Sequence, residues 1–128
     1  MRDTVWNDAR IIVVDDDAAT LRLIDLILER AGYENVYGTT DPHEAIDACA
    51  ASQPDLIVLD LHMPGIDGLS LLERIRSYVP EGAYLPVLVV TGDLSPWARQ
   101  RALSSGAKDF LTKPFDTPEV LLRIRNLL

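Results

Sequence analysis

Residues 11–17 read Ile-Ile-Val-Val-Asp-Asp-Asp, so that four β-branched apolar residues end abruptly in three acids. A short apolar run without polar alternation is typical of a strand that is covered on both faces of its sheet. The pattern returns in residues 56–60, Leu-Ile-Val-Leu-Asp, and in residues 86–91, Pro-Val-Leu-Val-Val-Thr. The sequence therefore predicts three buried strands, each followed or ended by a polar residue.

A helix is predicted between the first strand and the next segment of the chain. From Ala18 onward, Leu21, Ile24, Leu28 and Ala31 recur at every third or fourth position, which is the spacing of a helix that buries one face. A glycine follows directly, and glycine is a common residue just after a helix end.

The remaining elements show the same alternation. Asp41-Pro42-His43-Glu44 has an N-cap acid, a proline in the first turn and an acid at the capping-box position, so a helix is predicted from Pro42 to about Ser52. The other predicted elements are a weak strand over 36–39, a helix with Leu69, Leu72, Ile75 and Val79 on its buried face, a helix capped by Ser95-Pro96, a strand over 107–112 and a helix over 119–128.

Strands and helices thus alternate five times, and this order predicts the fold class. Parallel strands need a crossover connection, which a helix supplies, so the order favours a five-stranded parallel sheet with helices on both faces. The expected fold is a doubly wound α/β structure of (βα)5 type, formed by residues 1–128 as a single domain. In such folds functional groups gather where the strands end, near the topological switch point.

Composition and charge exclude several classes of protein. The chain has a net charge of -8, which argues against direct binding to a nucleic-acid backbone. Its lone cysteine, Cys49, cannot form an internal disulfide and is expected to be a buried core residue in a reducing compartment. The sequence shows neither a signal-peptide pattern nor an apolar run of membrane-spanning length, so a cytoplasmic protein without membrane contact is expected.

Four of the predicted strands end in groups that could carry out chemistry: Asp15 and Asp16, Asp60, Thr91, and Lys113. The carboxyl ends of parallel strands share one edge of a sheet, so these side chains are expected to converge. Three carboxylates would repel one another unless a hard cation bridges them, and oxygen ligands suit Mg²⁺. A lysine and a hydroxyl opposite them suit the oxygens of a phosphoryl group. Phosphoryl transfer to a carboxylate is the predicted chemistry.

Several stretches carry a family resemblance. Residues 11–16 (IIVVDD), 60–68 (DLHMPGIDG) and 113–115 (KPF), together with Thr91, resemble the receiver-domain motifs of bacterial response regulators. The resemblance extends over nearly the whole chain and implies the flavodoxin-like receiver fold. It also implies that Asp60 is the phosphoacceptor, that Asp15, Asp16 and Asp60 bind Mg²⁺ and that His62 gives its backbone carbonyl to the metal.

The resemblance also assigns roles to residues on the last two strands. Thr91 and Lys113 would contact the phosphoryl oxygens, and Phe110 would be the aromatic switch residue that turns inward on activation. The Lys113–Pro114 peptide is expected to be cis, an isomer that proline makes accessible. His62 and Asp93 would tune the rate at which the phosphoryl group hydrolyses.

The implied function is a signalling switch that catalyses its own phosphorylation and slow dephosphorylation. Its phosphodonor would be a sensor histidine kinase or a phosphotransfer protein. Phosphorylation would change the surface formed by the helix at 97–103, the strand at 107–112 and the helix at 119–128, which could support a homodimer. An N-terminal receiver of a longer regulator, followed by an output domain, is favoured over a stand-alone protein.

Two other functions compete with this interpretation. Residues 14–17 faintly resemble the nucleophile motif of haloacid-dehalogenase-type phosphatases, in which Asp15 would carry the phosphoryl group. That alternative leaves Asp60 without a role, and Ala19 stands where a hydroxyl residue or valine is expected. A receiver that has lost its chemistry and only binds partners would lack a site residue, and none is missing.

Histidines and tryptophans invite further site hypotheses. His43 and His62 have no cysteine or histidine at metal-ligand spacing, so their side chains are expected on a helix surface or in a loop. Trp6 and Trp97 could anchor a partner, but packing within the domain is the favoured interpretation.

Overall fold

The computed structural model of the protein describes residues 8–63, 68–79, 82–92 and 95–128. Its strands are β1 (Arg10–Val14), β2 (Asn35–Thr39), β3 (Leu56–Leu59), β4 (Val87–Thr91) and β5 (Asp109–Thr112). They form one parallel sheet in the order β2-β1-β3-β4-β5. The helices are α2 (Ala18–Arg30), α3 (Pro42–Ser52), α4 (Gly68–Arg76), α5 (Pro96–Ser104) and α6 (Thr117–Leu127). The predicted doubly wound (βα)5 fold is confirmed.

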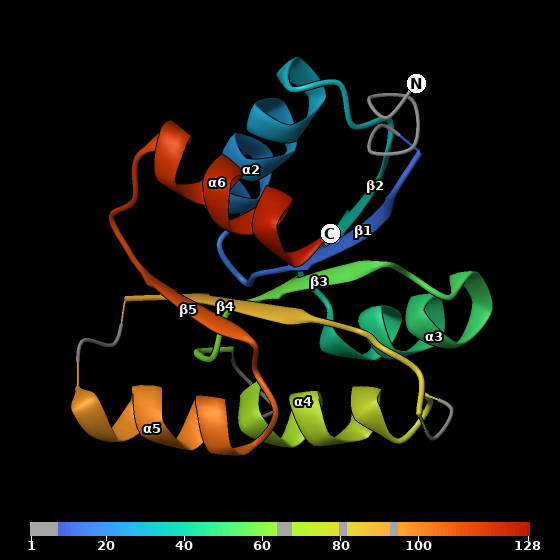
Figure 1. Ribbon diagram of the computed structural model, residues 1–128, viewed down its shortest axis with the longest axis vertical. Helices are drawn as coiled ribbons and strands as arrows, with labels where there is room; N and C mark the ends of the chain where they lie inside the picture. The colour runs from blue at the N-terminus through green and yellow to red at the C-terminus, as the bar shows by residue number, and fades with distance from the viewer. Residues whose placement is uncertain (1–7, 64–67, 80–81, 93–94) are drawn as a thin grey trace.

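Helices cover both faces of the sheet, with α2 and α6 on one side and α3, α4 and α5 on the other (Figure 1). Successive strand residues point to opposite faces, so each strand serves two cores. In β1, Ile12 and Val14 join the cluster under α3 and α4, while Ile11 and Val13 join the cluster under α2 and α6. Two apolar layers therefore hold the central strands in place, which explains why these strands lack polar alternation.

Side-chain caps begin four of the helices, as the sequence suggests. The carboxylates of Asp17, Asp41 and Asp116 and the hydroxyl of Ser95 accept backbone N–H groups of the first turns of α2, α3, α6 and α5. The capping-box role expected of Glu44 is wrong. Its Oε1 instead accepts hydrogen bonds from Tyr37 (3.1 Å) and Thr39 (3.2 Å), because both hydroxyls lie on the adjacent strand β2.

Three predicted boundaries differ from the structure. Helix α6 begins at Thr117 rather than Glu119, because Asp116 caps the helix and Pro118 fits its first turn. Helix α4 ends at Arg76, so Val79 packs against the core from the following turn and not from the helix. Strand β5 begins at Asp109 rather than at residue 107, although Lys108 N already donates to Val87 O at 2.9 Å.

Candidate functional site

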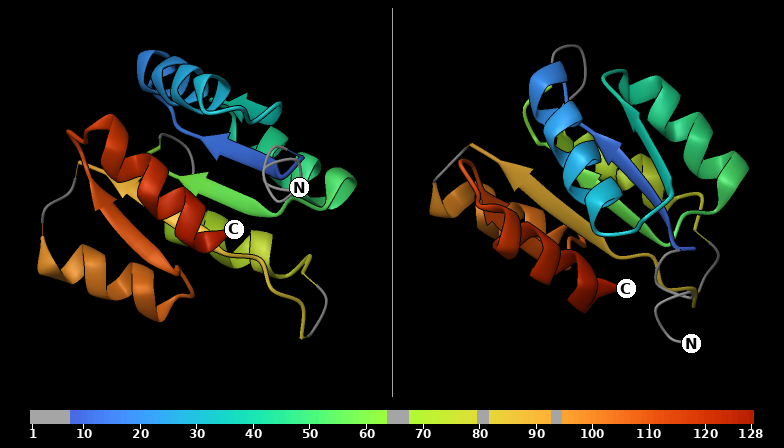
Figure 2. Two further views of the ribbon diagram at one scale, coloured as in Figure 1. Left: turned by 45° about the horizontal axis from the view of Figure 1, so that its top comes forward. Right: turned by 90° about the horizontal axis from the view of Figure 1, so that it is seen from above.

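Backbone hydrogen bonds bring the polar strand ends together at the carboxyl edge of the sheet. Asp60 N donates to Val14 O at 3.0 Å, which places Asp60 beside the end of β1. Lys113 N donates to Thr91 O at 2.8 Å, which fixes the end of β5 against the end of β4. The four chain segments therefore meet in adjacent strands β1, β3, β4 and β5, as the two rotated views of the sheet show (Figure 2).

Three carboxylates form the centre of this site. One oxygen from each of Asp15, Asp16 and Asp60 lies within 4.8 Å of the others. Asp15 and Asp60 are buried, at 2% and 5% exposure, whereas Asp16 is exposed. This juxtaposition confirms the expectation that the acids of the first and third strands converge at one edge.

Lys113 supplies the positive charge of the site. Its Nζ lies 2.7 Å from Asp15 Oδ2 and 3.3 Å from Asp60 Oδ2, so one ammonium bridges two buried carboxylates. The contact with Asp15 was not expected from the sequence, which suggested only a role for Lys113 toward phosphoryl oxygens. It arises because β1 and β5 both flank the central pair β3 and β4 and end at the same edge.

Burial and charge shift the pKa values in this cluster. Burial raises the pKa of Asp15, and the nearby charge of Asp60 adds to this, although Lys113 and the N–H of Asp17 act against them. Burial also disfavours the ammonium form of Lys113, but its hydrogen bond to Asp15 and the charges of Asp15 and Asp60 outweigh it, and the pKa of Lys113 is raised. For Asp15 burial outweighs the attraction of Lys113, whereas for Lys113 the two acids outweigh burial.

The donor set suits a hard divalent cation. With all groups ionised, three carboxylates and one ammonium leave two negative charges at the site, which a divalent cation would balance. Asp16 is exposed and could reach a hydrated ion, while Asp15 and Asp60 offer buried oxygen ligands. Carboxylate oxygens with access to water are the ligands that Mg²⁺ prefers.

The turn after β3 is held by its own contacts. His62 N donates to Asp60 Oδ1 at 3.2 Å, and Gly68 N donates to Leu61 O at 3.1 Å where α4 begins. A Cβ at position 68 would lie 2.4 Å from the Cα of Leu61, so glycine is required for this close approach. His62 is exposed, as expected. Residues 64–67 of the motif at 60–68 lie outside the described residues.

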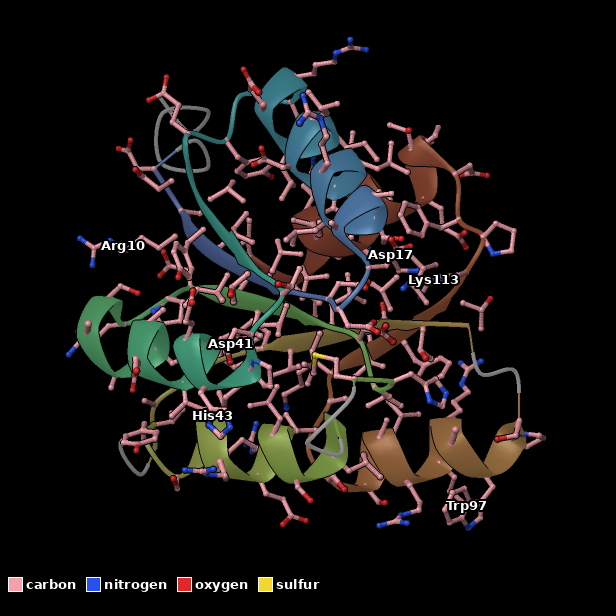
Figure 3. All side chains as sticks on the ribbon, turned by 180° about the vertical axis from the view of Figure 1, so that it is seen from behind. Arg10, Asp17, Asp41, His43, Trp97 and Lys113 are labelled. Atoms are coloured by element: carbon pink, nitrogen blue, oxygen red, sulfur yellow. The ribbon has the colours of Figure 1, made fainter. Side chains whose placement is uncertain are left out.

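Asp17 has a structural role beside the site. Its carboxylate accepts hydrogen bonds from Thr20 Oγ1 at 2.8 Å and Ala19 N at 3.1 Å and so caps α2. These hydrogen bonds lower its pKa. Asp15 Oδ1 in turn accepts the N–H of Asp17 at 2.9 Å, and Figure 3 shows Asp17 and Lys113 at the same end of the sheet. The acidic run of the sequence therefore divides into site acids and a helix cap.

The two expected switch residues are buried near the site. Thr91 is fully buried at the end of β4, and Phe110 lies in β5 with 4% exposure. The guanidinium carbon of Arg99 lies 5.8 Å from the centroid of the Phe110 ring, a contact that no sequence signal indicated. The Lys113–Pro114 peptide is cis, as expected. Asp93 lies outside the described residues.

The remaining candidates are not part of the acidic cluster. His43 is exposed on α3, distant from Lys113 (Figure 3), and Cys49 is buried, with burial raising its pKa to about 11. Packing within the domain was the wrong expectation for Trp97, which is 63% exposed and stacks with Arg101 at 4.8 Å. The buried residues of α5 are instead Ala98 and Ala102, which have short side chains. Trp6 lies outside the described residues.

Comparisons with known proteins agree with the geometry. The family model of the response regulator receiver domain matches residues 11–125. Vibrio cholerae chemotaxis protein CheY4 superimposes with a TM-score of 0.84 at 28% identity, covering 94% of this chain and 99% of that one. A CheY-like receiver domain protein from Methanospirillum hungatei gives a TM-score of 0.84 at 29% identity, with 93% and 92% covered.

Longer relatives match over the same region. Response regulator MprA of Mycolicibacterium vanbaalenii is 43% identical over 119 residues, which is 93% of this chain and 50% of MprA. The DNA-binding dual master transcriptional regulator RpaA of Synechocystis is 40% identical over 119 residues, 93% of this chain and 48% of RpaA. The chain thus spans about half the length of these curated relatives. Among its described residues, no helix is long and apolar enough to cross a membrane.

Proposed function

The chain belongs to the response regulator receiver domain family, whose members are phosphorylation-regulated signalling switches, and we propose that Asp60 is its phosphoryl acceptor. The observation that carries this assignment is the position of Asp60. It is buried, one of its oxygens lies within 4.8 Å of an oxygen of each of the other two acids, and its Oδ2 lies 3.3 Å from the ammonium of Lys113. An ionised carboxylate is already a nucleophile, so no general base is needed.

In the proposed transfer, a carboxylate oxygen of Asp60 attacks the phosphorus of a phosphohistidine. The new O–P bond forms as the P–N bond breaks, and the leaving imidazole keeps the electrons of that bond and takes up a proton. Lys113 neutralises charge on the phosphoryl oxygens, and the buried Thr91 hydroxyl donates a hydrogen bond to one of them. These residues position the group and balance its charge.

The three acids of the site, including the acceptor Asp60, would hold Mg²⁺. Asp15, Asp16 and Asp60 would provide carboxylate oxygens, and His62 its backbone carbonyl. The bound ion supplies charge neutralisation for the incoming phosphoryl oxygens. Loss of the phosphoryl group to water would return the switch to its starting state slowly.

The proposed phosphodonor is a sensor histidine kinase or a phosphotransfer protein in the cytoplasm, as the family membership suggests. The proposed output surface is formed by α5, β5 and α6, where Phe110 of β5 is buried and Trp97 of α5 and Leu122 of α6 are exposed. This surface would engage a second copy or an output domain. Sedimentation of the wild-type protein and of Leu122→Glu, each with and without beryllofluoride, tests this surface. Beryllofluoride should raise the mass of the wild-type protein but not that of the variant. Equal masses for both proteins under both conditions would remove α6 from the interface.

A small phosphodonor tests the acceptor assignment without the kinase. With acetyl phosphate and Mg²⁺, the wild-type protein should gain one phosphoryl group by intact mass, and Asp60→Asn should gain none because an amide is a poor nucleophile. Asp55→Asn is a matched control, since Asp55 directly precedes β3 at its other end and is exposed. A phosphorylated fraction in Asp60→Asn equal to that of the control would refute the proposal.

A further inference from the structure

The two edge strands of the sheet differ in their protection against pairing with another chain. β5 has four residues, begins with Asp109, whose carboxylate accepts the N–H of Phe110 at 2.8 Å, and is followed by Lys113-Pro114. Charges, prolines and short length are the usual protections of an edge strand. β2 has five residues without a charge or a proline, and Asn35, Tyr37 and Gly38 are exposed. Its outer edge lacks these protections.

Within the described residues, the outer side of β2 carries backbone hydrogen-bonding groups that no neighbouring strand uses. Asp15 N donates to Thr39 O at 3.3 Å, so the backbone groups of Thr39 face β1. Backbone direction alternates along a strand, which places the N–H and C=O groups of Val36 and Gly38 on the side away from β1. In the described residues no strand pairs with that side, and β2 is the last strand of the sheet (Figure 2).

The two faces of the sheet differ beside this edge. One face carries the hydrogen-bonded ring of Tyr37, and the other, which α2 covers, carries acidic side chains. Tyr37, 44% exposed, donates its hydroxyl to Glu44 at 3.1 Å, which fixes the ring next to the strand. On the α2 side, a groove of about 410 Å³ is lined by Val36 and three exposed carboxylates. These belong to Asp25, Glu29 and Glu34.

The charge of these three carboxylates is not balanced by any ion pair among the described residues. Within the described part of the chain, none of them has an ion-pair partner. Asp25 and Glu29 lie four residues apart on α2, where like charges destabilise a helix. The groove therefore offers concentrated negative charge directly beside free backbone donors and acceptors.

We propose that β2 binds an extended basic segment of a partner protein by strand addition. The partner backbone pairs with Val36 and Gly38, and lysine or arginine residues at alternate positions point into the groove of Asp25, Glu29 and Glu34. A strand shows every second side chain on the same face, so alternate bases are what this geometry selects. A second copy of this chain is disfavoured, because pairing two β2 edges would bring two acidic grooves together. The proposal is independent of phosphorylation at Asp60.

A capped hexapeptide that alternates lysine and valine is the direct probe, used with the full chain labelled with ¹⁵N. We expect the amides of Val36 and Gly38 to shift and to exchange more slowly with solvent, while the inward-facing amide of Tyr37 changes little. The same peptide with N-methylated backbone has equal charge but cannot pair as a strand. It should bind at least about tenfold more weakly, the factor that a loss of 1.4 kcal/mol in hydrogen bonding would produce.

Charge variants test the groove separately from the strand. Glu29→Gln and Glu34→Gln should each weaken peptide binding roughly two- to threefold at low salt, as expected for exposed charges, and Glu73→Gln on α4 should not. Equal binding of the N-methylated peptide, or shifts spread over all acidic surfaces without protection at Val36 and Gly38, would overturn strand addition. Protection of these amides that rises with protein concentration in the absence of peptide would instead identify a second copy as the occupant and would also overturn the proposal.

Discussion

The two ends of the same sheet carry charged residues in opposite arrangements. At the amino edge, Arg123 pairs with Asp109 at 2.9 Å, and Asp55 accepts the backbone N–H of Arg10 at 2.8 Å. At the carboxyl edge, three acids face the single ammonium of Lys113. At the amino edge each acid thus has a partner, a guanidinium or a backbone N–H, and these contacts hold chain segments together. At the carboxyl edge the buried like charges are not balanced and weaken the fold. Such an arrangement indicates a ligand-binding site.

The largest expected effect of a single substitution on ligand affinity is on metal binding at the carboxyl edge. Asp15→Asn should weaken Mg²⁺ binding by at least about tenfold, because it removes a buried anionic ligand. Losing a direct ligand costs more affinity than losing a residue that only hydrogen-bonds to a ligand. Asp109→Asn removes an acid of the amino edge and should leave the affinity unchanged. Titration of tryptophan or tyrosine fluorescence with Mg²⁺ gives both affinities. An equal loss of Mg²⁺ affinity in the two variants would contradict the claim that the metal binds at the carboxyl edge and not at the amino edge.

Removing the base at each edge should affect stability unequally. Lys113→Ala leaves Asp15 and Asp60 without a counter-charge, so the free energy of unfolding without Mg²⁺ should fall by about 1–2 kcal/mol, since the lysine is itself 22% exposed. Arg123→Ala should cost less than about 1 kcal/mol, because that ion pair is open to solvent.

Urea unfolding with and without Mg²⁺ measures the difference between these two variants. Added Mg²⁺ should restore most of the stability of Lys113→Ala, because the ion replaces the missing positive charge, and should not restore that of Arg123→Ala. A stability of Lys113→Ala that Mg²⁺ leaves unaltered would show that the lysine and the ion do not share the same acids.

A smaller effect should appear in the pH dependence of the metal-free protein. The pKa of Asp15 is raised from 3.8 by burial, so the folded state holds this proton more tightly than the unfolded state does. Its favourable contribution is complete below pH 3.8 and is lost as pH rises through the folded-state pKa. Asp15→Asn should therefore gain stability relative to wild type across this window. A constant difference between the two proteins in urea unfolding would contradict the shifted pKa.

The strands and the site residues could be predicted because both depend on local signals. Runs such as residues 11–14 are apolar throughout since they are covered on both faces, and in a parallel sheet the residues that follow such runs share one edge. The bond between Lys113 and Asp15 could not be predicted, because it depends on the order of strands in space. The exposure of Trp97 likewise depends on which face of α5 meets the sheet, and alanines there allow a close approach.

The central claim is that Asp60, and not Asp15, carries the phosphoryl group. Borohydride reduces an aspartyl phosphate to homoserine, which marks the acceptor position permanently. After treatment with acetyl phosphate and Mg²⁺, peptide mapping by mass spectrometry should find homoserine at position 60 and aspartate at position 15. Homoserine at position 15 with aspartate retained at position 60 would contradict the account and favour a phosphatase-type nucleophile at the end of β1.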